Sequence, residues 1–323
     1  ENFGGLNMSP NFKFAVLGDS RGTKAQSIQI NKPVLGKLLH DIKKYHNPDF
    51  ILFGGDMILG RATLNVDANT SFIFSNLLEW EMFVKKALGV NSLKDYVFPS
   101  IGNHDYSNSD NFKESIKAFN KAFYYLPSNS CNEDMLDGYG KTVYYFDYYN
   151  SRFIVLNTVF KSSSSGDPED KQQLIGITPE QLNWLENTLS SSNSTNNFIL
   201  LHCPIIGTYQ DYYSLPFDQQ EALFRIFNNY RIAGVYAGHE HSYNRRFITN
   251  VFFKADYALN KSIIQITSGG GGAPFEIPGD NRLNIVTGPA CIYEYGIIEV
   301  FDTLVKSAFY DTNGTCLDSF IYS

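Results

Sequence analysis

Metal-ligand side chains recur in five short loops of this sequence, each placed directly after an apolar segment. The loops are Gly18–Gly22, Gly54–Asp56, Gly102–Asp105, His202–Pro204 and Gly238–His241. The ligand-type residues in these loops are Asp19, Asp56, Asn103, His202, His239 and His241. Mixed oxygen and nitrogen donors of this kind suit divalent first-row metal ions. The sequence therefore predicts a metal site if the fold brings the five loops together.

Each loop alone is a weak signal. A Gly-Asp pair at the end of a strand is usually a turn or a helix cap, and an isolated His-x-His pair often lies on the surface. However, four of the six histidines fall within these loops. The other two, His40 and His46, lie on or just after the first predicted helix and are expected to be ordinary surface residues. The combination, rather than any one motif, indicates a site.

The order of predicted elements places these loops at one edge of a sheet. In the first half, apolar strands alternate with amphipathic helices: strands at Phe12–Gly18, Asp49–Gly54 and Tyr96–Ile101, and helices at Lys32–Tyr45, Phe72–Leu88 and around Phe112–Tyr125. This order favours a parallel or mixed sheet with right-handed crossovers. Loops beyond the carboxyl ends of such strands converge on one crevice. The first three ligand loops are expected to meet there.

The second half adds further strands and two helices. We predict strands at Thr142–Tyr149, Arg152–Thr158, Phe198–Leu201 and Ile232–Tyr236, helices at Thr178–Leu189 and Phe217–Asn229, and mainly strands from Phe247 to Ile321. Thr178 and Gln181 have the spacing of a capping box. Gly269–Gly272 interrupts the late strands, and glycines there can let the chain pass close to the site. No Pro/Gly/Ser-rich linker divides the sequence, so residues 1–323 are expected to form one domain of two packed sheets.

Composition limits the class of partner. The chain has 323 residues, 43% hydrophobic and 18% charged, which is typical of a globular protein. Its net charge of −7, without a Lys/Arg-rich block, argues against general binding of nucleic acids or anionic membranes. No apolar run reaches the roughly 20 residues that span a bilayer. An anionic substrate therefore needs a local positive centre, which bound metal ions would supply.

Two features favour the secretory pathway. The sequence starts at Glu1 rather than Met, and it holds an even number of cysteines: Cys131, Cys203, Cys291 and Cys316. N-x-S/T sequons begin at Asn7, Asn69, Asn193, Asn260 and Asn313. A secreted glycoprotein is the expectation, although a chain rich in Asn and Ser also produces such triplets by chance. Cys291 and Cys316 are a candidate pair, and Cys203 is expected to be a small buried residue rather than a soft metal ligand.

The ordered motifs resemble the calcineurin-like metallophosphoesterase superfamily. Its series Gly-Asp, Gly-Gly-Asp, Gly-Asn-His-Asp, His-x-Pro and Gly-His-x-His is present from Asp19 to His241. Gly238–Arg245 is similar to the Gly-His-x-His-x-Tyr-x-Arg of the purple (tartrate-resistant) acid phosphatase branch. Tyr243 and Arg245 in this run can line a substrate pocket or pack the loop. The resemblance covers nearly the whole chain and implies an αββα architecture, two mixed sheets packed as a sandwich between helices.

The resemblance also implies which residues bind metal. A first divalent ion would be held by Asp19, Asp56 and His241. Asp56 would bridge to a second ion held by Asn103, His202 and His239. In this family a hydroxide that bridges the two ions attacks phosphorus, and two such ions lie roughly 3.5–4 Å apart. The implied cofactors are thus two divalent metal ions (Mn, Zn, Fe or Mg), and the implied substrate is a small phosphorylated molecule.

Two further residues are predicted to be catalytic. The resemblance implies that His104 protonates the leaving alkoxide, whereas a structural histidine hydrogen-bonded to Asp105 is the simpler alternative. Arg21 stands where many superfamily members have a metal-binding His. Arg cannot ligate a cation, but its fork suits a phosphate oxygen or a neighbouring carboxylate.

Residue 59 departs from the family pattern. Purple acid phosphatases have a metal-binding Tyr three positions after the bridging Asp, and other relatives have an Asp there that orients the catalytic His; here it is Leu59. The purple colour should be absent, and Asp105 or a backbone carbonyl must orient His104. An acid-phosphatase-like phosphomonoesterase is the leading interpretation. A phosphodiesterase or nucleotide hydrolase, decided by the loops Gly60–Asn69 and Lys161–Gln173, and an inactive scaffold are the alternatives.

Overall fold

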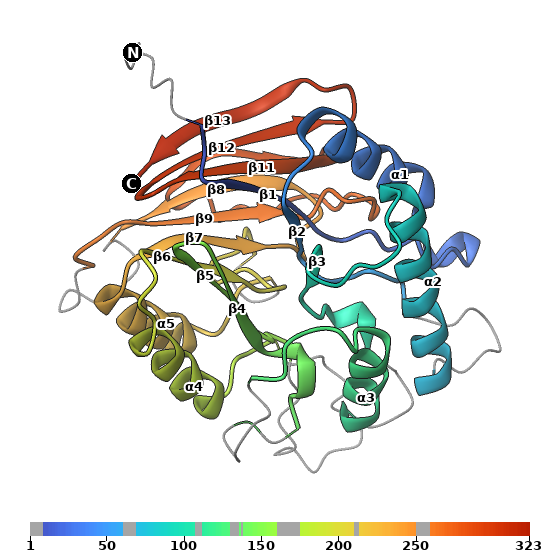
Figure 1. Ribbon diagram of the computed structural model, residues 1–323, viewed down its shortest axis with the longest axis horizontal. Helices are drawn as coiled ribbons and strands as arrows, with labels where there is room; N and C mark the ends of the chain where they lie inside the picture. Colours follow the sequence, from blue (N-terminus) through green and yellow to red (C-terminus); the bar gives the residue numbers. More distant parts are fainter. Residues whose placement is uncertain are drawn as a thin grey trace.

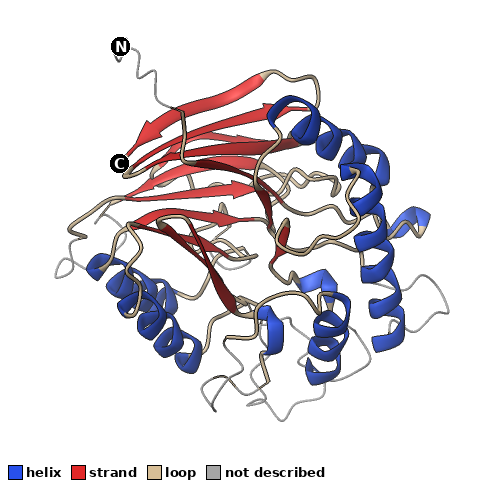
Figure 2. Cartoon of the chain, in the orientation of Figure 1, coloured by secondary structure: helices blue, strands red, loops and turns tan. Residues whose placement is uncertain are grey.

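The chain folds into two mixed β-sheets packed face to face, with helices on the outer sides (Figures 1 and 2). This computed structural model describes residues 9–60, 69–106, 112–129, 136, 138–159, 175–209, 213–249 and 259–323. The six-stranded sheet has the order β13-β12-β11-β1-β2-β3, and the seven-stranded sheet has the order β10-β8-β9-β7-β6-β5-β4. The predicted αββα class is confirmed.

Both sheets combine parallel and antiparallel strands. In the first sheet β1 is parallel to β2 and β2 to β3, whereas β11, β12 and β13 add antiparallel strands. In the second, β5, β6, β7 and β9 are parallel, whereas β4, β8 and β10 pair antiparallel. The strands of the first sheet are β1 (Phe12–Leu17), β2 (Phe50–Phe53), β3 (Val97–Pro99), β11 (Glu294–Phe301), β12 (Leu304–Asp311) and β13 (Cys316–Tyr322). Those of the second are β4 (Tyr144–Tyr148), β5 (Ser151–Val155), β6 (Asn196–Leu200), β7 (Ile232–Ala237), β8 (Tyr243–Ile248), β9 (Ile263–Ser268) and β10 (Ile285–Ala290).

Aromatic rings fill the space between the sheets. Phe14 of β1 lies 5.2 Å from both Phe153 of β5 and Phe198 of β6, measured between ring centroids. Phe50 of β2 stacks on Phe14 at 5.4 Å and meets Phe153 at 5.0 Å. Because side chains alternate along a strand, the next residues point outward to the helices. Phe53, for example, packs on Trp80 of α2 at 4.9 Å.

The helices cover the two outer faces. Figure 1 shows α1 (Lys32–Asp41), α2 (Thr70–Leu88) and α3 (Phe112–Ala122) along the side of β1–β3, and α4 (Pro179–Ser190) and α5 (Phe217–Asn229) against the second sheet. A single turn of π-helix, Ile42–His46, extends α1. The second sheet and its two helices share a separate apolar cluster that includes Trp184, Leu185 and Phe224. Among the described residues no helix is long and apolar enough to cross a membrane.

Several local predictions need correction. Thr178 caps α4 by accepting from the Gln181 amide at 3.3 Å, but the Gln181 side chain does not close the predicted capping box. It binds the amide and the carbonyl of Asn157 instead, at 2.8 Å each. His40 is exposed as expected, whereas His46 is half-buried with Nε2 3.1 Å from the Tyr295 hydroxyl. The Tyr295 contact exists because β11 lies beside β1, which local sequence cannot reveal.

The predicted pairing of Cys291 with Cys316 is wrong. Both thiols are free and exposed, and they lie near the backbone carbonyls of Glu276 and Asp318 respectively. Cys203 is buried and free. Cys131, residues 61–68 of the loop Gly60–Asn69 and the loop Lys161–Gln173 lie outside the described residues.

Candidate metal centre and active site

The five ligand loops meet at the carboxyl ends of the parallel strands of the two sheets. Three loops follow β1, β2 and β3 of the first sheet, and two follow β6 and β7 of the second. Backbone hydrogen bonds tie neighbouring loops to one another: the Asp19 amide donates to the Gly55 carbonyl at 2.9 Å, and the Gly238 amide donates to the His202 carbonyl at 2.9 Å. The convergence expected from the sequence is therefore present.

Asp19, Asp56 and His241 form one group of possible ligands. Their carboxylate and imidazole atoms lie within 4.8 Å of one another, and all three side chains are buried. The Nδ1 atom of His241 lies 2.7 Å from the Pro274 carbonyl, so Nδ1 carries the proton. The unprotonated Nε2 then faces Asp19 Oδ1 at 3.8 Å. This is the set predicted for the first metal ion.

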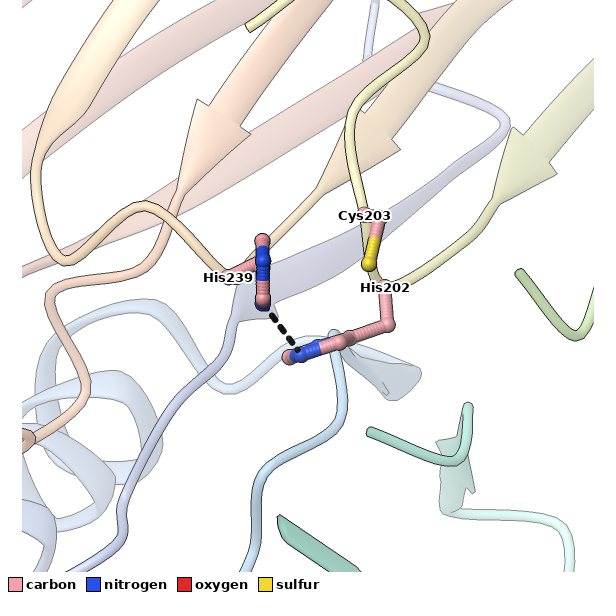
Figure 3. A group of neighbouring side chains, drawn as sticks. All are labelled: His202, Cys203 and His239. Atoms are coloured by element: carbon pink, nitrogen blue, oxygen red, sulfur yellow. Dashed lines mark hydrogen bonds between the residues drawn. The ribbon is translucent and has the colours of Figure 1, made fainter. Parts of the chain in front are cut away.

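The second group centres on His202. Its Nδ1 donates to the Gly54 carbonyl at 2.7 Å, which leaves Nε2 as an acceptor. Nε2 lies 2.9 Å from Asn103 Oδ1 and 3.3 Å from Asp56 Oδ1. The Nδ1 atom of His239 approaches the same nitrogen at 3.1 Å (Figure 3). Asp56 thus belongs to both groups, as a bridging ligand must.

The chemistry of these atoms fits a cation. Three acceptors, on His202, Asn103 and Asp56, converge with their lone pairs toward one another, which is unfavourable unless a positive charge lies between them. The Nδ1–H of His202 held by a carbonyl is the outer-shell arrangement that orients a metal-binding imidazole. Nε2 of His239 is buried and has no hydrogen-bond partner among the described residues. The residues present therefore fit two divalent ions.

Cys203 lies beside the second group but is a poor ligand. Its sulfur is within 4.8 Å of the ring nitrogens of His202 and His239 (Figure 3). Burial raises the pKa of this thiol, which disfavours the thiolate, the form that binds metal. The amide oxygen of Asn103 is the better donor to the same position. This agrees with the interpretation of Cys203 as a small buried residue.

Burial sets the protonation of the cluster. It lowers the pKa of His202, His239 and His241, the last to about 3, so the imidazoles stay neutral and can donate lone pairs. Burial, and then the neighbouring Asp56, raises the pKa of Asp19. Burial alone would also raise the pKa of Asp56, but His202, His104 and Arg21 outweigh it and lower that pKa. Of the two carboxylates, Asp56 is the one held ionised.

Backbone conformation brings the ligands in. Asp19, Asp56 and His239 adopt positive φ angles of 62°, 50° and 68°, which Asp and His tolerate better than bulkier residues. Strain of this kind is common at functional sites. Gly238 allows the closest approach, since a Cβ there would lie 2.2 Å from Asp19 Oδ2. Sequence motifs alone could not reveal that these ligands sit in left-handed conformations.

His104 is oriented by a backbone carbonyl. Its Nδ1 lies 2.6 Å from the Leu59 oxygen, and its Nε2 is 4.0 Å from Asp56 Oδ2. Asp105, the other candidate, instead uses its carboxylate to accept from the amides of Gly102 and Met57 at 2.8 and 3.0 Å. Residue 59 thus orients His104 through its main chain. Asp105 fixes the loops that carry His104 and Asp56.

The sequence as a whole matches a known family. A family model described as calcineurin-like phosphoesterase matches residues 12–243, which contain all six predicted ligands. The chain belongs to the calcineurin-like phosphoesterase family. The resemblance inferred from the motifs is therefore confirmed. A search of curated protein sequences found no significant match.

Solved structures with the same fold include a purple acid phosphatase. That protein, from yellow lupin (Lupinus luteus) seeds, superposes with a TM-score of 0.68 at 18% identity, covering 98% of this phosphoesterase and 54% of the lupin chain. The phosphoesterase thus spans about half the length of the lupin protein. PhoD has a TM-score of 0.60 at 13% identity, covering 97% of this chain and 72% of its own. GAP50, the anchor in the inner membrane complex of Plasmodium, has a TM-score of 0.57 at 14% identity, covering 96% of this chain and 87% of its own.

Arg21 lies at the mouth of this phosphoesterase site between two carboxylates. Its Nε is 3.6 Å from Asp56 Oδ2 and its Nη2 is 3.4 Å from Glu276 Oε1. The side chain is 12% exposed, and Nε has no hydrogen-bond partner within the described parts of the chain. Glu276 also accepts a hydrogen bond from the Tyr213 hydroxyl and lies 3.5 Å from His241 Nδ1. Neither Glu276 nor Tyr213 lies in a motif, so the sequence did not point to them.

Tyr243 and Arg245 pack the loop rather than line the pocket of this phosphoesterase. The Tyr243 hydroxyl donates to Asp318 Oδ2 at 2.7 Å, and Arg245 binds both oxygens of Asp318 at 2.7 and 3.2 Å. Asp318 is on β13, so these contacts join β8, which follows the Gly-His-x-His loop, to the far edge of the first sheet. Of the two alternatives raised by the sequence, packing is the one realised.

The Gly-rich stretch of this phosphoesterase forms the back of the metal centre. The Gly271 amide donates to the Gly18 carbonyl and the Ala273 amide donates to the Asp19 carbonyl, both at 2.7 Å. A Cβ on Gly271 would lie 2.2 Å from the Gly18 oxygen, so only glycine permits this approach. Beneath it lies Glu294, whose carboxylate accepts from the Ser268 hydroxyl at 3.0 Å. Burial raises the pKa of Glu294 to about 8.

Proposed function

We propose that this phosphoesterase hydrolyses phosphate monoesters with two divalent metal ions. The observation that carries the proposal is the convergence of Asp56, Asn103 and His202 around one point, beside Asp19, His239 and His241. The neutral imidazoles, together with the Arg21 guanidinium held beside Asp56, support an acid-phosphatase-like monoesterase.

Bound metal ions would clamp the phosphoryl group and lower the pKa of a water molecule toward neutrality. The protein orients the reactants around them. Asp56 would bridge the two metal positions, Asp19 and His241 would complete one, and Asn103, His202 and His239 would complete the other. The carbonyls of Gly54 and Pro274 hold His202 and His241 with their Nε2 atoms turned inward.

His104 is suited to donate a proton to the leaving oxygen. Its Nδ1–H is fixed on the Leu59 carbonyl, so the proton that it exchanges is on Nε2, which faces the metal centre. General acid catalysis of this kind contributes about 10²–10⁴-fold to rate. Arg21, whose Nε lies 3.6 Å from Asp56 Oδ2 but has no hydrogen-bond partner among the described residues, is suited to bind a phosphate oxygen.

The metals are expected to be colourless divalent ions. Leu59 has no oxygen donor, so it cannot form the tyrosinate–iron bond that colours purple acid phosphatases. The ring of Tyr213 packs on His239 at 5.0 Å, but its hydroxyl is bound to Glu276. The mixed N/O donor set accommodates Mn, Zn, Fe(II) or Mg.

Assays on an aryl phosphate and on its diester, run in parallel on the purified protein, test the substrate class. The proposal expects the monoester to be hydrolysed with the higher kcat/KM. Preference for the diester would favour the alternative of a phosphodiesterase or nucleotide hydrolase. No hydrolysis of either, with the metals bound, would favour an inactive scaffold; GAP50, which has the same fold, is the anchor in the inner membrane complex of Plasmodium.

We also propose that the protein passes through the secretory pathway and is glycosylated. In support, four sequon residues are exposed: Asn69, Asn193, Asn260 and Asn313. The unpaired Cys291 and Cys316 do not add support, because disulfides are the usual state of cysteines in secreted proteins. A mass shift after glycosidase treatment of the native protein tests this proposal.

A further inference from the structure

Glu276 is a carboxylate beside a site proposed to bind an anion. Its negative charge would repel a bound phosphate. It lies on the segment between β9 and β10, and its side chain is 39% exposed. One oxygen approaches Arg21 Nη2 at 3.4 Å and His241 Nδ1 at 3.5 Å. The other accepts from the Tyr213 hydroxyl. The carboxylate therefore has fixed partners on both sides.

The position of Arg21 explains why a carboxylate is needed. Among the described residues, Arg21 forms ion pairs with Asp56 and Glu276, and it also interacts electrostatically with Asp19, another predicted metal ligand. Asp56 is also the shared member of both ligand groups, so bound metal ions would take up its negative charge. Two divalent ions would then repel the guanidinium at short range. Glu276 would be the acidic neighbour left to hold Arg21 beside the metal centre.

We infer that Glu276 is a positioning residue for phosphate binding: it anchors Arg21 beside the metal centre so that the guanidinium can bind a phosphate oxygen. Tyr213 supports it by holding the second carboxylate oxygen. The Tyr213 ring is itself fixed between His239, at 5.0 Å, and Tyr209, at 5.2 Å. This inference rests on the proposed phosphatase function and assigns a new role within it.

Simple electrostatics and the anchoring role predict opposite effects of Glu276→Gln on phosphate binding. If Glu276 merely lay near the phosphate, Glu276→Gln would remove a repulsive charge and strengthen phosphate binding. If it anchors Arg21, the same change weakens phosphate binding, by about tenfold on the scale of outer-shell substitutions. Gln keeps the size of the side chain and an acceptor for Tyr213, so the charge is the main change.

The test measures binding of inorganic phosphate to the metal-loaded protein by titration calorimetry, with metal content determined for each sample. Four proteins form a cycle: wild type, Glu276→Gln, Arg21→Ala and the double variant. Arg21→Ala is expected to weaken phosphate binding by about tenfold to a hundredfold, the value of a hydrogen bond to a charged group. In the Arg21→Ala background, Glu276→Gln should no longer weaken binding. Tyr213→Phe should weaken it less than Glu276→Gln does.

Glu221→Gln is the matched control, because Glu221 pairs with Arg225 on the exposed face of α5, and it should leave phosphate binding unchanged. Stronger phosphate binding by Glu276→Gln would overturn the inference. An equal loss of phosphate affinity on Glu276→Gln in the wild-type and the Arg21→Ala proteins would also overturn it. So would a loss of bound metal in Glu276→Gln, because the effect would then act through the predicted ligand His241. If the metal-loaded wild type neither bound inorganic phosphate nor hydrolysed esters, the proposed function itself would fail.

Discussion

Replacement of His104 by Ala tests the proposed proton donor, and the structure predicts how the effect depends on the substrate. The side chain is 10% exposed; its Nδ1 lies 2.6 Å from the Leu59 carbonyl, and its Nε2 faces Asp56 Oδ2 at 4.0 Å. The His104 amide also donates to Asp56 Oδ1 at 2.8 Å, and Ala keeps this backbone bond. The change should therefore remove the proton without displacing the bridging carboxylate.

The loss should be large for poor leaving groups and small for good ones. An alkyl phosphate leaves as an alkoxide that needs a proton, so kcat should fall by about 10²–10⁴-fold, or about 3–5.5 kcal/mol. An activated nitrophenyl ester leaves as a stable phenolate, so its kcat should fall by less than about tenfold.

Steady-state assays of the two esters on wild type, His104→Ala and the control His40→Ala measure the difference. His40 is an exposed residue of α1, so its substitution should change neither rate. Equal losses of kcat on both esters would show that His104 is not the proton donor, because they would assign it to metal binding or folding.

Four further substitutions probe the centre and its surroundings. Asn103→Ala and His202→Ala should each abolish hydrolysis while circular dichroism stays native, and survival of activity in both would contradict the metal assignment. Gly238→Ala would place a Cβ 2.2 Å from Asp19 Oδ2, so metal content should fall in elemental analysis; unchanged content would show that the loop adapts. Glu294, with its pKa raised from the ordinary 4.5 to about 8 by burial, destabilises the fold as pH rises between these values, since the unfolded chain ionises first. Relative to wild type, Glu294→Gln should gain about 4 kcal/mol in the free energy of urea unfolding between pH 5 and pH 8.5, and a constant difference would contradict the assigned pKa.

The sequence predicted that the six ligand-type residues converge, because each lies in a loop that follows an apolar strand. Strand-ending loops such as Gly18–Gly22 and Gly54–Asp56 converge by a general rule of α/β sheets, so no knowledge of distant contacts was needed. The helix Phe217–Asn229 and the strand pattern were predictable for the same reason: apolar periodicity is local.

Contacts made across the chain were not predictable. Glu276 reaches Arg21 over 255 positions, and it lies in a segment with neither periodicity nor motif. Gln181 had capping-box spacing, yet its side chain binds Asn157, because α4 packs against the end of β5. In each case the side chain binds a residue that is distant in the sequence, and the local sequence pattern does not reveal that contact.

The orientation of His104 shows an intermediate case. Its likeness to a catalytic histidine was visible in the motif, and Leu59 showed that the usual carboxylate partner was missing. The substitute could be narrowed to Asp105 or a backbone carbonyl. Only the structure shows that the carbonyl of Leu59 itself takes that place.

Elemental analysis of protein purified without a nickel column is the most direct test for a centre that binds two metal ions. We predict about two divalent ions per chain in a colourless solution, falling in the His202→Ala and Asn103→Ala variants. A fully active protein that holds no metal, or only one ion per chain, would contradict the account. A purple solution would contradict the inference that Leu59 prevents formation of a tyrosinate–iron bond.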